Sequence, residues 1–149
     1  MMSMKAKYGI QALLILAREY GRGPLMASDI SSREGMPKRF VEQILVDLKR
    51  NGIVQSRRGK GGGYYLSRLP STISINQLIR VLNGPVAWLP CVNDGATTYC
   101  AECLDPSACA IKGIFDEVQT ATMRILEHRT LADLVNRGPK TLQTGPQGQ

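Results

Sequence analysis

The sequence has no apolar run long enough to cross a membrane. Its longest run extends from Ala12 to Ala17 and is followed at once by Arg18 and Glu19, whereas a membrane helix needs about 18 or more apolar residues. The first ten residues also lack the basic, apolar and small-residue order of a secretion signal. We therefore expect a cytoplasmic protein with no membrane partner.

Acidic residues are absent between positions 48 and 93, although this stretch holds seven basic residues. Positive charge is concentrated in the first half of the chain: residues 1–70 contain 13 Lys and Arg against 5 Asp and Glu, whereas residues 71–149 contain 6 against 7. Such segregation is typical of a surface that binds a polyanion, although a solvated basic surface without a partner has the same composition. The seven residues are Lys49, Arg50, Arg57, Arg58, Lys60, Arg68 and Arg80.

Signs of an active site are also lacking. The chain has one histidine, distant in sequence from any Ser or Cys, and it shows no recognisable carboxylate pair and no nucleotide-binding fingerprint. The best enzymatic alternative is a thiol oxidoreductase acting through Cys100-x-x-Cys103, but the strand–helix–strand context of such enzymes is missing. A redox adaptor without DNA affinity is a further alternative, which the acid-free stretch disfavours. We expect no enzyme.

Cysteine is absent outside one short segment. Cys91, Cys100, Cys103 and Cys109 all lie within 19 residues. A disulfide scaffold spreads its cysteines across a small secreted domain, so clustering in a cytoplasmic chain indicates metal or redox chemistry instead.

The first half of the chain predicts three helices and a hairpin. Helices are expected over residues 4–20, 27–34 and 37–50, the last with an inner apolar stripe at helical spacing. Short β-prone segments at 53–56 and 64–67 flank a basic, glycine-rich tip, which predicts a β-hairpin. A capping box from Ser74 to Gln77 opens a helix to about residue 82. The inner stripe consists of Val41, Ile44, Leu45 and Leu48.

The second half predicts a loop and one long helix. Residues 88–109 show no periodicity, and a helix is expected from about residue 107 to 128, followed by a last helical turn at 130–136. A seam of apolar residues runs along the long helix at nearly heptad spacing. Residues 138–149 are polar and rich in Gly and Pro, so we expect disorder. The seam consists of Ile111, Ile114, Val118, Ala121 and Ile125.

This order of elements predicts a mainly α fold: a winged helix-turn-helix with a small β-hairpin wing and a long C-terminal dimerisation helix. We divide the chain into a DNA-binding domain (1–84), a cysteine-rich sensor loop (85–106), the dimerisation helix with its C-terminal turn (107–136) and a disordered tail (137–149). A two-fold dimer would bury the apolar seam and match a palindromic site on double-stranded DNA.

The outer face of the third helix and the wing carry the candidate DNA contacts. In such motifs the second helix of the pair enters the major groove, where Glu42 and Gln43 are suited to base edges. Glycines at the wing tip allow close approach to the backbone, and Arg58 there is suited to a narrow minor groove. Tyr64 is more often hairpin packing than base stacking. The candidates are Lys38, Arg39, Glu42, Gln43, Arg57, Arg58, Lys60 and Tyr64.

The sequence resembles a family of bacterial regulators that includes IscR, NsrR, RirA and CymR (the Rrf-two family). The resemblance covers roughly residues 3–135, and the wing is its most specific part. It implies a homodimer on DNA whose long C-terminal helix crosses between subunits, with Glu42 and Gln43 at base-reading positions and Arg58 in the minor groove. The matching segments are 7–13, 40–45, 56–66, 73–79 and 130–134.

The cysteines have the pattern C-x8-C-x2-C-x5-C. Thiolates are the preferred ligands of iron–sulfur clusters, and a two-knuckle zinc site usually has a second close pair. In the family, cluster-binding members carry three cysteines here and one ligand from elsewhere; Cys91, Cys103 and Cys109 align best with those three, and Cys100 is additional. We expect a 2Fe–2S or 4Fe–4S cluster; a thiol or disulfide switch, zinc and inert thiols remain alternatives.

The chain departs from this family at both known positions of the fourth ligand. IscR-like members have a histidine where this chain has Lys112, and NsrR-like members have an aspartate where it has Lys7. Cys100 is therefore the natural substitute. His128 lies about five helical turns beyond the last cysteine and is expected to be a surface residue.

Overall fold

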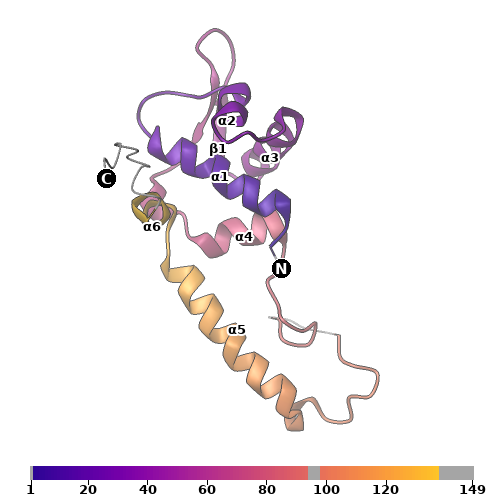
Figure 1. Cartoon of the computed structure of the whole chain (residues 1–149). Helices are drawn as coiled ribbons and strands as arrows, with labels where there is room; N and C mark the ends of the chain where they lie inside the picture. The colour runs from indigo at the N-terminus through magenta and orange to yellow at the C-terminus, as the bar shows by residue number, and fades with distance from the viewer. Residues whose placement is uncertain (1, 94–97, 138–149) are drawn as a thin grey trace, which may run out of the picture.

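In the computed structural model, which describes residues 2–93 and 98–137, a compact head carries one long helix that extends away from it (Figure 1). The head contains α1 to α4, α6 and the hairpin, and α5 forms the extension. The elements are α1 (Met4–Arg18), α2 (Ala27–Arg33), α3 (Lys38–Arg50), β1 (Val54–Arg57), β2 (Gly63–Leu66), η1 (Pro70–Thr72), α4 (Ile75–Asn83), η2 (Pro106–Ala108), α5 (Ala110–His128) and α6 (Leu131–Arg137).

The α1 helix is the centre of the head and packs against α2, α3, α4, α6 and β2. Ser3 caps its first turn, because the hydroxyl accepts a hydrogen bond from the amide of Ala6 at 3.1 Å. The helix ends at Arg18, two residues earlier than expected, and Tyr20 beyond it is 42% exposed. Its buried residues are Ala6, Gly9, Ala12, Leu13, Ile15, Leu16 and Ala17.

The predicted hairpin is present, with each strand shifted by one residue. β1 and β2 are antiparallel, in a register from Val54–Leu66 to Arg57–Gly63. Leu25, in the connection between α1 and α2, pairs with Tyr64 through two backbone hydrogen bonds of 2.9 and 2.7 Å. The hairpin is therefore attached, through β2, to the connection between α1 and α2.

The predicted capping box of α4 is only half formed. The Ser74 hydroxyl accepts a hydrogen bond from the amide of Gln77 at 3.2 Å. The Gln77 side chain does not return to Ser74, because its oxygen accepts a bond of 2.6 Å from the guanidinium of Arg68. A full capping box occurs instead at α6, where Thr130 and Asp133 bond each other's amides.

The long helix begins at Ala110 rather than at position 107. Pro106–Ala108 form a separate 3-10 turn, and Cys109, with extended backbone, is the N-cap of α5. Its carboxyl end is attached to the head: the Asn76 amide donates to Glu127 at 2.6 Å, and the amide of Ile75 donates to the carbonyl of Arg129 at 2.8 Å. The amino-terminal half of α5 lies beyond the head (Figure 1).

The mainly α winged-helix architecture is thus confirmed, and no helix in residues 2–93 and 98–137 is long and apolar enough to span a membrane. The described part of the segment 88–109 contains no helix or strand other than the turn η2. The expected disorder of residues 138–149 lies outside the described residues, and the four-part division of the chain stays a prediction.

Candidate functional site

The α3 helix presents its predicted polar face to solvent because its other face is buried. Val41, Ile44, Leu45 and Leu48 are at most 1% exposed, and the ring of Phe40 meets Tyr8 of α1 edge-to-face at 5.6 Å. This packing fixes the rotation of the helix about its axis, so that the candidate contact residues Lys38, Arg39, Glu42 and Gln43 are all exposed.

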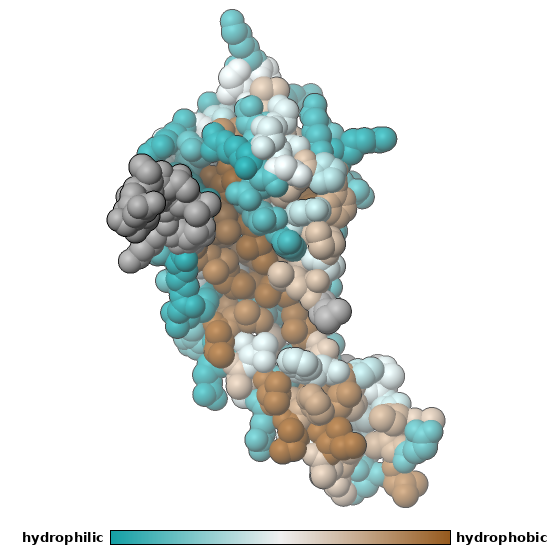
Figure 2. Space-filling model, viewed as in Figure 1, coloured by the Kyte–Doolittle hydropathy of each residue, from teal (hydrophilic) through white to brown (hydrophobic). Residues whose placement is uncertain are grey.

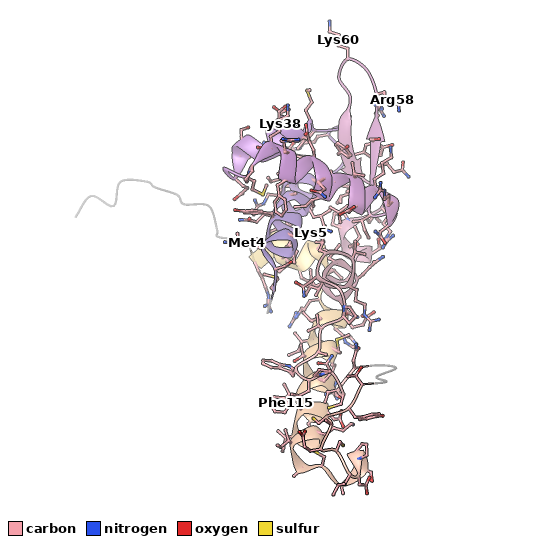
Figure 3. The ribbon with its side chains drawn as sticks, turned by 90° about the vertical axis from the view of Figure 1, so that its right-hand side faces the viewer. Met4, Lys5, Lys38, Arg58, Lys60 and Phe115 are labelled. Carbon is pink, nitrogen blue, oxygen red and sulfur yellow. The ribbon has the colours of Figure 1, made fainter. Side chains whose placement is uncertain are left out.

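Glycines shape the tip of the hairpin between Arg57 and Gly63. Gly59 and Gly61 adopt left-handed backbone angles, with φ of 92° and 73°, which other residues adopt only at a cost. The resulting turn projects Arg57, Arg58 and Lys60 into solvent. Figure 3 shows Lys60 at the tip, Arg58 beside it and Lys38 at the same end of the molecule.

Both carboxylates of α3, Asp47 and Glu42, have basic partners. Asp47 bonds Lys5 at 2.7 Å and lies 3.7 Å from the guanidinium of Arg50. The carboxylate of Glu42 lies 3.8 Å from the ammonium of Lys38, one turn earlier in α3. Within the described residues, the side chains of Arg39, Arg57, Arg58 and Lys60 have no hydrogen-bond or ion-pair partner. These exposed cations are suited to phosphate oxygens.

Tyr64 differs from the other candidate DNA contacts in its burial. Its side chain is half-buried and packs against the core, where its backbone pairs with Leu25. It lines a shallow groove between α3 and the hairpin, together with Lys38, Glu42, Arg57 and Gly63. The position agrees with hairpin packing.

One contact of this surface was missed by the sequence analysis. The Lys49 ammonium, at the end of α3, donates a hydrogen bond of 2.6 Å to the hydroxyl of Ser56 in β1. Lys49 therefore links the recognition helix to the wing. The basic stretch from position 49 suggested a charge at this point, but nothing in the sequence pointed to its partner.

The four cysteines are free thiols in the connection between α4 and α5. Cys91, Cys103 and Cys109 are partly buried, and Cys100 is exposed. Cys100 and Cys103 share one turn, closed by a hydrogen bond of 3.0 Å from the Cys103 amide to the Cys100 carbonyl. The Cys109 sulfur accepts a hydrogen bond from the amide of Lys112, 3.5 Å away, at the start of α5.

Partial burial raises the pKa of the Cys103 thiol, and the charges of Cys109, Cys100 and Cys91 add to this shift. The other three sulfurs are thus close enough to Cys103 to act on it electrostatically. The number and softness of the four thiols fit an iron–sulfur cluster. Among the described residues, however, no three Cys, His, Asp or Glu side chains are arranged to hold a metal ion.

Lys112, at the position where the family resemblance implies a histidine ligand in IscR-like members, bonds within its own helix. Its ammonium bonds Asp116 at 2.6 Å, and this hydrogen bond raises the pKa of Lys112. A protonated ammonium has no lone pair for a metal. Lys112 is thus no replacement for that ligand, in agreement with the sequence analysis.

The apolar seam of α5 is open to solvent in the single chain. Ile111, Ile114 and Ile125 are 64%, 59% and 61% exposed, and no residue of α5 is buried. Figure 2 shows apolar surface over this part of the molecule as well as over the head. His128 is exposed, as expected; its Nδ1 donates a hydrogen bond of 2.8 Å to the carbonyl of Arg124.

Comparison with known proteins places this arrangement in a family. The model of the Rrf2 family, described as "Iron-dependent Transcriptional regulator", matches residues 2–137. An rrf2-like HTH-type transcriptional regulator of Rhodobacter capsulatus is 41% identical over 141 residues, covering 93% of this chain and 94% of the relative.

Two solved structures share the fold. The structure of CymR, the global cysteine regulator of Bacillus subtilis, has a TM-score of 0.77 at 28% identity, covering 92% of this chain and 97% of that one. IscR of T. potens has a TM-score of 0.71 at 30% identity, covering 92% and 87%. These relatives are regulators rather than enzymes, as expected for this chain. The chain belongs to the Rrf2 family of transcriptional regulators.

Proposed function

We propose that this regulator binds a palindromic site in double-stranded DNA as a homodimer and senses redox state, iron supply or nitric oxide through a cysteine-ligated iron–sulfur cluster. The observation that carries the DNA-binding part is the cluster of exposed cations on α3 and the wing that have no partner among the described residues, at the end of the molecule away from α5.

Each part of this surface has a role. The exposed face of α3 enters the major groove, where Glu42 and Gln43 read base edges and Lys38 and Arg39 contact phosphates or guanine. The wing lies along the DNA backbone with Arg57, Lys60 and Tyr64, and Arg58 enters the minor groove. The hydrogen bond from Lys49 to Ser56 connects the end of α3 to the wing and so fixes their relative position.

The dimer is supported by the exposed seam of α5. Three isoleucines at about 60% exposure on one helix are unusual for a chain that acts alone, and a second copy that pairs along the same seam would bury them. The two recognition helices then face successive turns of the DNA.

The proposed sensor is the cysteine segment. Cys91, Cys103, Cys109 and the exposed Cys100 supply four thiolates, and the family description as iron-dependent supports iron as the metal. A bound cluster makes the segment responsive to oxidants and iron supply. Residues before Cys91 pack on α5, where Trp88 faces Phe115 at 6.2 Å and Gln119 donates to the carbonyl of Val86. Movement of Cys91 would therefore act on α5 through these contacts.

A thiol switch without a cluster is the second candidate. It is favoured by the single turn that holds Cys100 and Cys103, in which loss of two electrons and two protons to an oxidant joins the two sulfurs.

The test is purification without oxygen, followed by an absorption spectrum and assays of iron and acid-labile sulfide. We expect brown protein with stoichiometric iron and sulfide, and binding to a palindromic duplex that weakens steeply with salt. Colourless, iron-free protein whose DNA affinity changes on thiol oxidation would support the thiol switch instead.

A further inference from the structure

The two faces of the hairpin line two different cavities. Side chains alternate along a strand, so Tyr64 of β2 lines the shallow groove next to α3, whereas Tyr65 lines a cavity between the hairpin and the end of α1, here called the back cavity. Arg57 of β1 lines both. The wing is therefore a wall shared by the proposed DNA-facing groove and the back cavity.

The back cavity has the size and the lining of a small-molecule site. Its volume is about 480 Å³, and ligand sites commonly have about 300–1,000 Å³. Its apolar lining includes Leu16 and Leu66, each only 3% exposed. Residues 21–24 contribute a further part of the lining, and they belong to the same connection whose Leu25 pairs with Tyr64.

Two tyrosine rings line the back cavity without stacking on another ring. Tyr20 is 42% exposed, and among the described residues its side chain makes no hydrogen bond or ring contact. The hydroxyl of Tyr65 donates a hydrogen bond of 3.0 Å to the side-chain oxygen of Gln55, but its ring also contacts no other described ring. An aromatic ligand would find two partners here for offset or edge-to-face packing.

The charged groups of the back cavity favour an anionic ligand. Arg57 is exposed and has no partner among the described residues, and a guanidinium binds a carboxylate through two parallel hydrogen bonds. Glu19 also lines the cavity, but its carboxylate bonds Arg33 at 3.1 Å and lies 4.0 Å from Arg22. The negative charge of Glu19 is thus offset, whereas the positive charge of Arg57 is not.

We propose that the back cavity binds a small aromatic carboxylate, with the ring against Tyr20 and Tyr65 and the carboxylate on Arg57, and that this ligand weakens DNA binding. The inference rests on the proposed DNA-binding surface and adds a means of regulating it. An Arg57 guanidinium that holds a carboxylate is not available to a phosphate, so the ligand and the duplex compete for one side chain. By linkage, DNA lowers the affinity for the ligand by the same factor.

Titration calorimetry with 2-naphthoate tests the site in the full-length protein. We expect one molecule bound per chain, and about tenfold weaker binding by Tyr20→Ala, because an aromatic packing partner is lost. Tyr99→Ala removes another exposed tyrosine, which does not line the cavity; it is the matched control and should bind like the unmodified protein.

The uncharged analogue 2-naphthamide tests the role of the carboxylate. It has the same rings, and we expect it to bind at least about tenfold more weakly than 2-naphthoate, because hydrogen bonds to a charged group are the stronger ones. No binding of 2-naphthoate at millimolar concentration, or equal binding by Tyr20→Ala and the unmodified protein, would overturn the site.

Fluorescence anisotropy with a duplex selected from random sequences tests the competition. At constant ionic strength, saturating 2-naphthoate is expected to weaken DNA binding by the unmodified protein about tenfold. Tyr20→Ala should bind DNA normally without the ligand and respond little to it, since Tyr20 is not a candidate DNA contact. Bound ligand that leaves the DNA affinity unchanged would overturn the competition. If the protein binds no duplex even without ligand, the proposed function fails, and the calorimetry still decides whether the site exists.

Discussion

Gly63 of β2 passes the backbone of Leu25 so closely that a Cβ atom at position 63 would come within 2.3 Å of the Leu25 carbonyl oxygen. Its φ of 143° also lies in the region that favours glycine. The pairing of Leu25 with Tyr64, which attaches the wing to the head, therefore depends on the missing side chain of the residue next to it.

Gly63→Ala is expected to lower the free energy of unfolding by about 2 kcal/mol or more, since it combines a backbone clash with strain. Gly61→Ala is the matched control: position 61 also has positive φ, but no other atom lies within 4 Å of a Cβ there, so we expect a loss of about 1 kcal/mol. Denaturant titrations measure both. Equal losses would mean that the wing does not pass so close to Leu25.

Arg58→Ala is expected to weaken DNA binding by about 1–3 kcal/mol on most sequences, because this exposed cation is free to contact the duplex. Fluorescence anisotropy over a range of salt concentrations measures the change. Arg137→Ala, at the end of α6, is the control and should leave the affinity nearly unchanged. If Arg58→Ala binds DNA as tightly as the unmodified protein and the control at every salt concentration, the wing does not contact DNA.

Glu42→Ala is expected to act on sequence preference rather than on overall affinity. A carboxylate that accepts a hydrogen bond from a base discriminates by about 1–3 kcal/mol, so its loss should reduce the difference between the preferred operator and its single-base variants. Competition binding across such a set is the measurement. An unchanged ranking of the variants would place Glu42 outside the base-reading face.

Val118→Glu is expected to give monomers with poor affinity for DNA, because the substitution puts a charge at the centre of the seam. Thr120→Glu, on the side of the same helix opposite the seam, should stay dimeric. Light scattering distinguishes the two, and circular dichroism shows whether both keep their helices. Since no residue of α5 is buried in the single chain, Val118→Glu should remain folded.

Cys103→Ala is expected to abolish the brown colour and the bound iron of protein prepared without oxygen, since Cys103 lies within the electrostatic reach of the other three sulfurs. Cys100→Ala, at the exposed position, is expected to destabilise the cluster, seen as faster loss of absorbance in air. Retention of full colour and iron by Cys103→Ala would exclude it as a ligand.

Asp133→Ala is expected to destabilise the chain at neutral pH only. Hydrogen bonds from Thr130 to the carboxylate lower the pKa of Asp133 in the folded state. The ionised form is therefore favoured by folding, and its contribution is present above the unfolded pKa of about 3.9 and lost as the pH falls below it. Thermal unfolding should separate the variant from the unmodified chain at pH 7, and the separation should decrease towards pH 3.

Residue periodicity and local propensity are enough to predict the order and kind of the main elements. The stripe of Val41, Ile44, Leu45 and Leu48 has helical spacing, and burying it leaves only one possible outer face for α3. The wing followed from two β-prone segments around a glycine-rich tip. Local propensity and periodicity decide these features, so they can be predicted from the sequence without knowledge of the tertiary structure.

Contacts between residues that are distant in sequence depend on how the elements pack in space. Leu25 carries no strand pattern of its own, and it pairs with Tyr64 only because α1 brings the two segments together. Gln77 could equally well have completed the capping box of Ser74, but its oxygen accepts a hydrogen bond from Arg68 instead. Cys109 became the cap of α5 rather than part of it, because Pro106 first starts a tighter turn. When several partners are available to one residue, their positions in the folded chain decide which contact forms. Composition and residue spacing do not contain these positions.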